Sequence, residues 1–214
     1  MKTIFCISGL GADERAFSKL NLPGYQLKVI QWKIPVPEET LEAYAMRMRH
    51  EIDENNPVLI GLSFGGIVCI EIAKQVPVEK IIIISSIKNK NELPLWMKLA
   101  AKSKLNRVFP MRSYKITVPV QNYFLGVKTQ EEKNIVTVSR RRANITYTNW
   151  AVNKIINWKN LWQPPKLYHI HGSSDKMFPI KKIKADAVVR NGGHFMIMNR
   201  ADEVSNLLLH FLNK

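Results

Sequence analysis

Short, nearly continuous apolar runs recur along most of the chain and alternate with segments of helical period. Runs rich in isoleucine, valine and leucine are typical of strands that are buried on both faces of a parallel sheet. Six segments have this character: residues 2–8, 25–32, 57–63, 79–86, 166–172 and 185–191. The pattern therefore predicts a mostly parallel sheet of about six strands.

Apolar positions between these runs recur at the three- and four-residue spacing of an amphipathic helix. This spacing is found in residues 13–20, 38–55, 64–75 and 200–214. Strands that alternate with helices favour a doubly wound α/β fold. The sequence contains no internal repeat and no linker that would divide it into two domains.

Residues 91–162 break this alternation. They contain four of the five tryptophans and patches of helical period such as 93–105 and 148–158, but no clear buried strand. We interpret them as a helical insertion between two core segments, residues 1–90 and 163–214. The alternative is a long crossover that packs on the sheet and covers no site.

Ser63 stands at the corner between the predicted strand 57–63 and the predicted helix 64–75, flanked by Gly61 and Gly65. This spacing is typical of a sharp strand-to-helix elbow that exposes a nucleophilic serine. Glycines on both sides allow the tight turn because they lack a β-carbon. The alternative is that Ser63 caps the first turn of the helix through its hydroxyl.

Two further polar side chains directly follow predicted strands. Asp175 comes just after strand 166–172, and His194 follows strand 185–191. The carboxyl ends of parallel strands share one edge of the sheet, where α/β proteins form their sites. The chain order serine, acid, histidine is that of a catalytic triad on this type of sheet. Histidine would take the serine proton during attack, and the carboxylate would hold the imidazole in the required tautomer.

Asp186 is a competing candidate for the acid because it lies close to Asp175 in sequence. It begins the strand 185–191, however, and is expected at the opposite edge of the sheet from the catalytic tips. The position therefore favours Asp175.

Backbone amides are the usual donors to the anionic oxygen of a tetrahedral intermediate. Phe64 offers one amide at the start of its helix, where the dipole also favours negative charge. The glycines of "SGLG" allow the end of the first strand to approach the same point, so Leu10 is expected to supply a second amide. The structural alternative is a glycine turn in which Asp13 caps the following helix, and the two interpretations are compatible.

The sequence resembles the α/β-hydrolase family over nearly its whole length. "GLSFG" matches the nucleophile elbow of that family, "HGSSDKMFP" the acid turn and "GGHF" the histidine loop. The resemblance implies a hydrolase fold with Ser63 as nucleophile, Asp175 as acid and His194 as base. It also implies that residues 91–162 form a cap over the pocket.

Three features depart from the family pattern. Ser8 stands where many members have the histidine of a His-Gly motif. The two antiparallel strands that commonly open the fold are absent. Only "KMFPIKKIK" separates the acid from the last strand, so the usual helix there is missing or reduced to a turn. These departures leave the triad intact.

The resulting hypothesis is a serine hydrolase that cleaves an ester or thioester of a small, mainly apolar substrate through an acyl-enzyme on Ser63. An apolar acyl or alcohol pocket is indicated by residues that could equally be plain core: Phe64, Trp96, Trp150, Met177, Phe195 and Met196. The first alternative is a binding protein or receptor that keeps the triad but turns over slowly or not at all. The second is a basic surface protein for nucleic acid or membrane on the same fold.

Composition and charge narrow these alternatives. The chain has 46% hydrophobic and 23% charged residues, as a globular domain does. Thirty-two Lys plus Arg against seventeen Asp plus Glu give a formal charge of +15. The bases are scattered, and the densest runs, "SRRRANI" and "IKKIKAD", lack the interleaved aromatics of a single-strand binding surface. We therefore expect a solvated basic face and no specific nucleic-acid partner.

No segment approaches the roughly 18 apolar residues of a membrane span, and the first apolar run is interpreted as a strand rather than a secretory signal. Cys6 and Cys69 give no disulfide framework, so the expected compartment is the reducing cytosol. His169 and His171 alternate along one strand and are expected to be structural. Because no zinc signature, P-loop or dinucleotide fingerprint is present, we expect neither a metal nor a cofactor.

Overall fold

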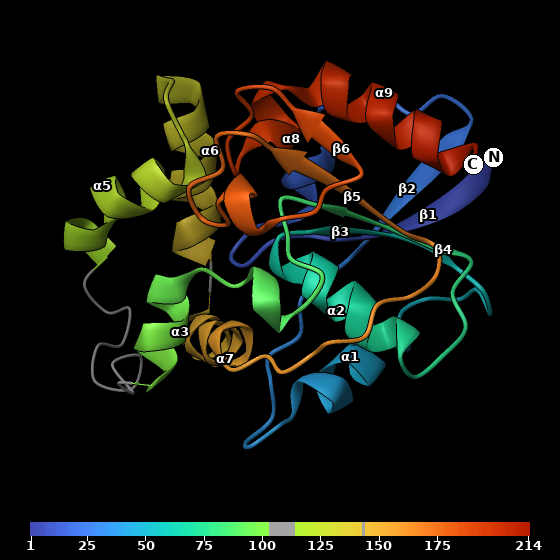
Figure 1. The fold of residues 1–214 in the computed structure, drawn as a ribbon, viewed down its shortest axis with the longest axis horizontal. Coiled ribbons are helices and arrows are strands. Elements are labelled where there is room, and N and C mark those ends of the chain that lie inside the picture. The colour runs from blue at the N-terminus through green and yellow to red at the C-terminus, as the bar shows by residue number, and fades with distance from the viewer. Residues whose placement is uncertain (103–113, 143) are drawn as a thin grey trace.

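The computed structural model describes residues 1–102, 114–142 and 144–214. At its centre is a six-stranded parallel sheet with the strand order β2-β1-β3-β4-β5-β6 (Figure 1). The strands are β1 (Lys2–Ile7), β2 (Tyr25–Ile30), β3 (Val58–Leu62), β4 (Lys80–Ile84), β5 (Leu167–Gly172) and β6 (Ala187–Val189). All six predicted strands are confirmed, and so is the α/β fold class.

The last strand is shorter than its predicted range of 185–191. β6 pairs only with β5, so it lies at an edge of the sheet. Its central residue, Val188, is 51% exposed, and Asn191 just beyond has a left-handed backbone with φ 59°. The apolar pattern overstated the strand because the chain turns away as soon as the pairing with β5 ends.

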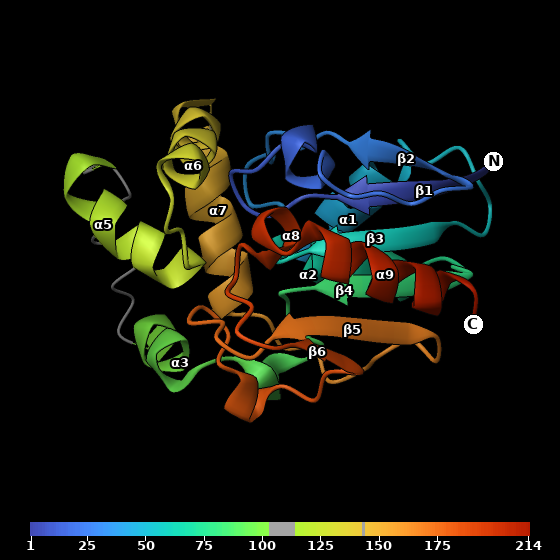
Figure 2. The same ribbon diagram turned by 90° about the horizontal axis from the view of Figure 1, so that it is seen from above.

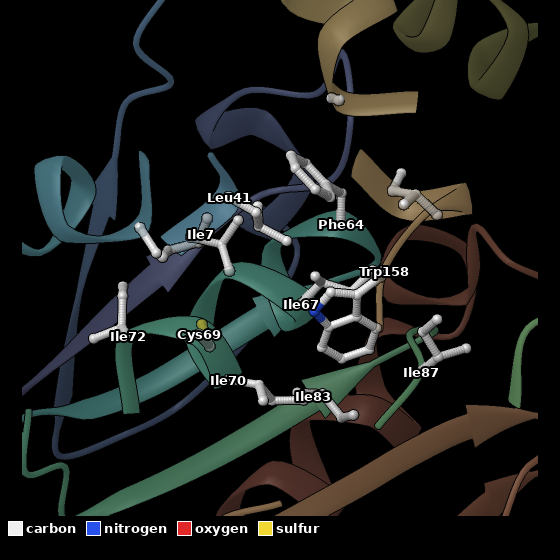
Figure 3. Close-up of a cluster of buried hydrophobic side chains, with 14 of the residues drawn as sticks. Ile7, Leu41, Phe64, Ile67, Cys69, Ile70, Ile72, Ile83, Ile87 and Trp158 are labelled. Atoms are coloured by element: carbon white, nitrogen blue, oxygen red, sulfur yellow. The ribbon is translucent and has the colours of Figure 1, made fainter. Parts of the chain in front are cut away.

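Helices cover both faces of the sheet (Figure 1). Helices α1 (Leu41–Arg49) and α2 (Phe64–Ala73) pack on one face, and α8 (Met196–Asn199) and α9 (Ala201–Leu212) pack on the other. A large cluster of buried apolar side chains lies on the α1 and α2 side, and Figure 3 shows the part of it around Cys69 and Trp158. Cys6 and Cys69 are buried free thiols in a strand and a helix, as predicted.

Two predicted helices are shorter than their periodicity suggested. Helix α1 begins only after Thr40, whose side chain accepts from the N–H of Ala43 at 3.1 Å, and it does not extend over the whole of 38–55. The segment 13–20 forms only the short 3-10 helix η1 (Glu14–Phe17). Other short 3-10 turns are η2 (Lys90–Glu92) and η3 (Ile180–Lys182). The η3 turn lies between Asp175 and β6, where the sequence predicted that the usual helix is missing or reduced to a turn.

Between β4 and β5 the structure describes four α-helices joined by loops, and no strand in the described residues. The helices are α3 (Leu95–Lys102), α5 (Tyr114–Leu125), α6 (Gln130–Arg142) and α7 (Ile145–Ile156). The end of the predicted helical pattern 93–105 lies outside the described residues. Figure 2 shows these four helices beyond the carboxyl ends of the strands, at the opposite end of the molecule from both termini.

Two tryptophans, one in α7 and one just after it, contact α1 and α2. The indole N–H of Trp158 donates to Oε1 of the buried Glu71 in α2 at 2.7 Å. The indole N–H of Trp150 donates to the carbonyl of Glu39, just before α1, at 3.0 Å. The centroid of the Trp150 ring also lies 4.4 Å from the centroid of the Tyr44 ring in α1. Helix α7 is therefore fixed to the sheet's helical layer by both packing and hydrogen bonds.

No helix in the described ranges has the length and apolar character needed to cross a membrane.

Candidate active site

Ser63 lies between β3 and α2 in a conformation that few side chains adopt. Its φ is 52° and its ψ is −116°, and non-glycine residues in this region are strained. The backbone is held by the bond from Ser63 N–H to the Ile84 carbonyl at 2.9 Å and by the hydroxyl of Ser86, which donates to the Ser63 carbonyl at 2.6 Å. The Ser63 side chain makes no capping hydrogen bond. The interpretation of Ser63 as a helix cap is therefore wrong.

The two glycines of the elbow are required by close packing of backbone on backbone. A β-carbon on Gly65 would lie 2.0 Å from the carbonyl oxygen of Ile7 in β1. A β-carbon on Gly61 would lie 2.4 Å from the α-carbon of Gly66. Both distances are far below van der Waals contact, so a side chain at either position would push α2 away from the sheet. The positive φ of the turn falls on Ser63 itself.

Ser63, His194 and Asp175 form one hydrogen-bonded row at the carboxyl edge of the sheet. Nε2 of His194 lies 2.9 Å from Oγ of Ser63, and Nδ1 lies 2.8 Å from Oδ2 of Asp175. His194 is 6% exposed and Asp175 is 4% exposed, whereas Ser63 is partly open. The three predicted triad residues are thus brought together, with an imidazole between a hydroxyl and a carboxylate.

The local turn fixes the carboxylate of Asp175. Its Oδ1 accepts from the N–H groups of Met177 and Phe178 at 2.8 and 2.9 Å, which leaves Oδ2 for His194. Burial acts to raise the pKa of Asp175, but its electrostatic interaction and hydrogen bond with His194 and the hydrogen bond from the N–H of Phe178 outweigh burial and lower it. Asp175 is therefore ionised at neutral pH.

The histidine loop is bonded to the acid turn along its length. The N–H of Ser174 donates to the Gly192 carbonyl at 2.9 Å, and the N–H of Asn191 donates to Oγ of Ser173 at 2.8 Å. On the other side, the N–H of Phe195 donates to the carbonyl of Leu125 in α5 at 3.0 Å. These bonds hold the backbone on both sides of His194, so the imidazole is held in a fixed orientation.

Two buried histidines lie behind the acid. Nε2 of His171 lies 2.8 Å from the Phe178 carbonyl and must donate, because a carbonyl only accepts. Nδ1 of His171 then accepts from Nε2 of His169 at 3.1 Å. Burial lowers the pKa of both histidines, so both are neutral.

His171 is also a neighbour of the acid that the sequence interpretation missed. Its Nε2 lies 3.6 Å from Oδ2 of Asp175. The expectation of a structural role treated His171 as independent of the site. Its position four residues before Asp175, at the end of the same strand, was the signal that could have linked the two.

The loop after β1 passes beside Ser63. A β-carbon on Gly9 would lie 3.4 Å from the β-carbon of Ser63. Ser8 stabilises this loop, because its hydroxyl donates to the Ala12 carbonyl at 2.8 Å and accepts from the indole N–H of Trp32 at 2.8 Å. Asp13 accepts from the N–H of Arg15 at 3.2 Å, so the predicted cap of the following helix is confirmed.

The two predicted oxyanion donors lie at this loop and at the elbow. Leu10 lines the cavity that contains Ser63, and Phe64 provides the first N–H of α2. Neither backbone N–H donates to an acceptor in the part of the chain that the structure describes. The prediction that they bind an oxyanion requires such unpaired N–H groups.

A cavity of about 750 Å³ opens over Ser63 and His194. Most of its lining is apolar and comes from α3, α5, α6, α7 and the loops at the sheet edge. Of the side chains that the sequence suggested for a pocket, three line it: Trp96, Met177 and Phe195. The others, Phe64, Trp150 and Met196, do not line it and pack in the interior. A cavity of this size and character is suited to a small, mainly apolar molecule.

Asp186 does not join this site. Its carboxylate accepts from the backbone N–H of His169 at 2.8 Å, in the middle of β5, and it precedes β6. Within the described residues, no group of three or more histidine, cysteine, aspartate or glutamate side chains is arranged to hold a metal ion.

A doubly wound parallel sheet with a serine, a histidine and an aspartate in one row at its carboxyl edge defines the fold of an α/β hydrolase. The sequence profile of the alpha/beta hydrolase family matches residues 11–207. The chain therefore belongs to the alpha/beta hydrolase family, and the resemblance noted from its motifs is confirmed. No curated protein sequence matches it significantly.

Solved structures with several activities are similar to the whole chain. A bromoperoxidase from Bacillus anthracis aligns with a TM-score of 0.73 at 15% identity, covering 100% of this chain and 92% of that chain. An esterase from Exiguobacterium antarcticum aligns with a TM-score of 0.72 at 13% identity, covering 100% and 92%. An epoxide hydrolase from Bacillus megaterium aligns with a TM-score of 0.66 at 13% identity, covering 100% and 94%. Similarity at these identities shows the fold, and function has to be argued from the site.

Proposed function

We propose that this protein is a serine hydrolase that cleaves an ester or thioester of a small, mainly apolar substrate. The observation that carries the proposal is the row of hydrogen bonds from Ser63 through His194 to Asp175, with Ser63 open to an apolar cavity. The esterases among the similar structures support it at the level of the fold.

In the proposed acylation step, Oγ of Ser63 attacks the carbonyl carbon of the substrate while Nε2 of His194 takes the hydroxyl proton. The developing oxyanion accepts hydrogen bonds from the N–H groups of Phe64 and Leu10. Asp175 stabilises the imidazolium without taking a proton itself. His194 then gives its proton to the leaving oxygen or sulfur, and the acyl group stays on Ser63.

In the proposed deacylation step, His194 takes a proton from water as the water attacks the acyl carbon. The second tetrahedral intermediate uses the same two amides. It collapses when the Ser63 oxygen leaves and takes the proton back from His194, which releases the carboxylic acid. No cofactor or metal takes part in either step.

The helical segment 91–162 is, in this proposal, a cap on a core made of residues 1–90 and 163–214. The support is that α3, α5, α6 and α7 contribute to the cavity wall over Ser63. Reducing cytosol is the compartment that fits the two buried free thiols.

The competing function is a small-ligand receptor on the same fold that does not turn over. The distinguishing experiment is a screen of the purified protein against chromogenic esters and acyl thioesters of graded chain length, with Ser63→Ala as the matched variant. A serine hydrolase shows turnover that Ser63→Ala loses by several orders of magnitude. Ligand binding without Ser63-dependent turnover of any ester would instead favour the receptor.

Labelling with a fluorophosphonate probe tests the nucleophile directly, because an activated serine attacks such phosphorus centres. We expect one label, on Ser63, that is lost in Ser63→Ala and kept in Ser18→Ala, which removes an exposed hydroxyl elsewhere. Labelling that persists in Ser63→Ala would contradict the assignment.

A further inference from the structure

The cavity over Ser63 combines an apolar wall with charge of a single sign. Among the described residues that line it, the charged side chains are Arg140 and Arg141, and none is a carboxylate. Both belong to the last turn of α6 and to the basic run "SRRRANI", the densest in the sequence. Part of the basic run that was expected to form a solvated face therefore lies at the wall of the proposed substrate cavity.

Arg141 has no counter-ion in the described part of the chain. Its side chain is exposed, and it forms no hydrogen bond or ion pair with any described residue. Some other surface cations are paired, among them Lys19 with Glu131 at 3.1 Å and Arg15 with Asp13 at 2.5 Å. A guanidinium left unpaired at the wall of an apolar cavity is free to bind an anion from the ligand.

The two acids of α6, Glu131 and Glu132, and Asp13, which lies 3.9 Å from Arg142, are already engaged. Glu131 pairs with Lys19, and Asp13 holds Arg15. Glu132 accepts from the N–H of Thr129 at 2.9 Å and from the Asn199 side chain at 2.9 Å. None of them lines the cavity. Among the described residues, no carboxylate at the cavity wall is therefore available to neutralise Arg141 when substrate binds.

We propose that the substrate is an anionic amphiphile, in which an apolar chain occupies the cavity and a carboxylate or phosphate binds Arg141 at its wall. The proposal rests on the proposed function and specifies its substrate class. Carboxylate and phosphate share the bidentate geometry that a guanidinium recognises, so the anionic chemistry is common to both. Arg141 has the role of a specificity-determining residue and takes no part in the reaction itself.

Two matched substrate pairs test the proposal and distinguish where the anion lies. The 4-nitrophenyl monoester of adipic acid and its methyl-capped counterpart have the same acyl chain, which ends in a carboxylate in the first and in a neutral methyl ester in the second. Hexanoyl-coenzyme A and hexanoyl-N-acetylcysteamine share the acyl chain and the thioester, but the thiol part of the first is larger and carries phosphates, whereas that of the second is short and neutral. We expect a higher kcat/KM for the anionic member of at least one pair.

The Arg141→Gln variant should lower the anionic-to-neutral ratio of kcat/KM about tenfold, and Arg141→Lys should retain part of it. Lys159→Gln is the matched control, because Lys159 is exposed and lies outside the cavity lining. A ratio that is independent of Arg141, or one that falls equally in Lys159→Gln, would overturn the proposal. The neutral esters report the hydrolase activity separately, since their turnover requires Ser63 but no anion.

A binding experiment keeps the proposal testable even without turnover. Calorimetry on the Ser63→Ala protein compares octyl phosphate with octanol, which share the apolar chain. Binding of octyl phosphate should be at least about tenfold tighter, and the double variant Ser63→Ala/Arg141→Gln should lose that preference. Equal affinities for the two ligands would overturn the inference whatever the outcome for catalysis.

Discussion

Oδ2 of Asp175 lies 2.8 Å from Nδ1 of His194, while Oδ1 of the same carboxylate is held by two backbone N–H groups. An amide at this position could present its NH₂ group to the imidazole and hold the wrong tautomer. Asp175→Asn should therefore keep the fold and lower kcat by about 10⁴-fold on any ester that the protein hydrolyses. Steady-state kinetics with a thermal melt as a check on folding measure this.

Asp186→Asn is the matched control for that variant. Asp186 accepts from the N–H of His169, away from the row of Ser63, His194 and Asp175. The Asp186→Asn variant should keep its turnover within a few-fold of the parent value, and any loss should be in its stability. Near-normal turnover in a folded Asp175→Asn protein would contradict the proposed role of the acid.

The buried histidines predict a loss of stability at mildly acid pH. Burial, above all, holds the pKa of His169 well below its ordinary value near 6.5, so the unfolded chain binds more protons than the folded one below that pH. Stability should fall as the pH drops below about 6.5, with about 1.4 kcal/mol per pH unit from each such histidine. Urea unfolding at several pH values between 5 and 7.5 measures the slope.

The variant His169→Gln isolates this contribution. A glutamine can still donate to Nδ1 of His171 but does not titrate, so the slope should be smaller by about 1.4 kcal/mol per pH unit. His210→Gln, at an exposed position on α9, is the control for the substitution itself. An unchanged slope in His169→Gln would mean that His169 is not the group that resists protonation.

His171 should position the acid turn through the Phe178 carbonyl. His171→Leu leaves that buried carbonyl without its donor, which should cost about 1–3 kcal/mol of unfolding free energy and lower kcat with little change in KM. His171→Gln retains a donor and should recover much of both losses. If both variants lose stability but keep the parent kcat, the contact is structural only.

Gly65→Ala should disrupt the elbow. The new methyl group would lie 2.0 Å from the Ile7 carbonyl, so α2 and β1 must separate and Ser63 must move. We expect turnover to fall by more than about 100-fold, because small displacements of a reacting group are costly. Gly24→Ala is the contrasting variant: its φ of 88° makes it strained by about 1 kcal/mol, but it lies far from Ser63 and should keep its turnover. Kinetics and melts on both variants separate the two effects.

The sequence was sufficient for the sheet and for the row of site residues because both depend on short-range patterns. Continuous apolar runs such as 79–86 predicted their strands, and the positions of Ser63, Asp175 and His194 after strands predicted that they would meet. The limits of β6 and of α1 were not predictable in this way. They depend on where pairing with β5 ends and on the cap at Thr40, and apolar periodicity records neither.

Contacts between distant segments also had no local signal. Alternation along β5 identified His169 and His171 as buried, but their contacts with each other and with the acid turn depend on side-chain direction. The same limit applies to Trp150, which packs against Tyr44 instead of lining the cavity. The scattered bases gave only a net charge, whereas the position of Arg141 at the cavity wall follows from how α6 is placed over the sheet.

The left-handed backbone at Ser63 has a consequence for engineering and selection. Glycine adopts a positive φ at little cost, so Ser63→Gly should raise the unfolding free energy by about 1 kcal/mol while it removes the proposed nucleophile. A screen for thermal stability alone would therefore favour glycine at this position, and a screen for turnover would restore serine. Residue 63 thus cannot be optimal for both thermal stability and turnover. A variant that is to be more stable and still active has to gain its stability at other positions in the chain.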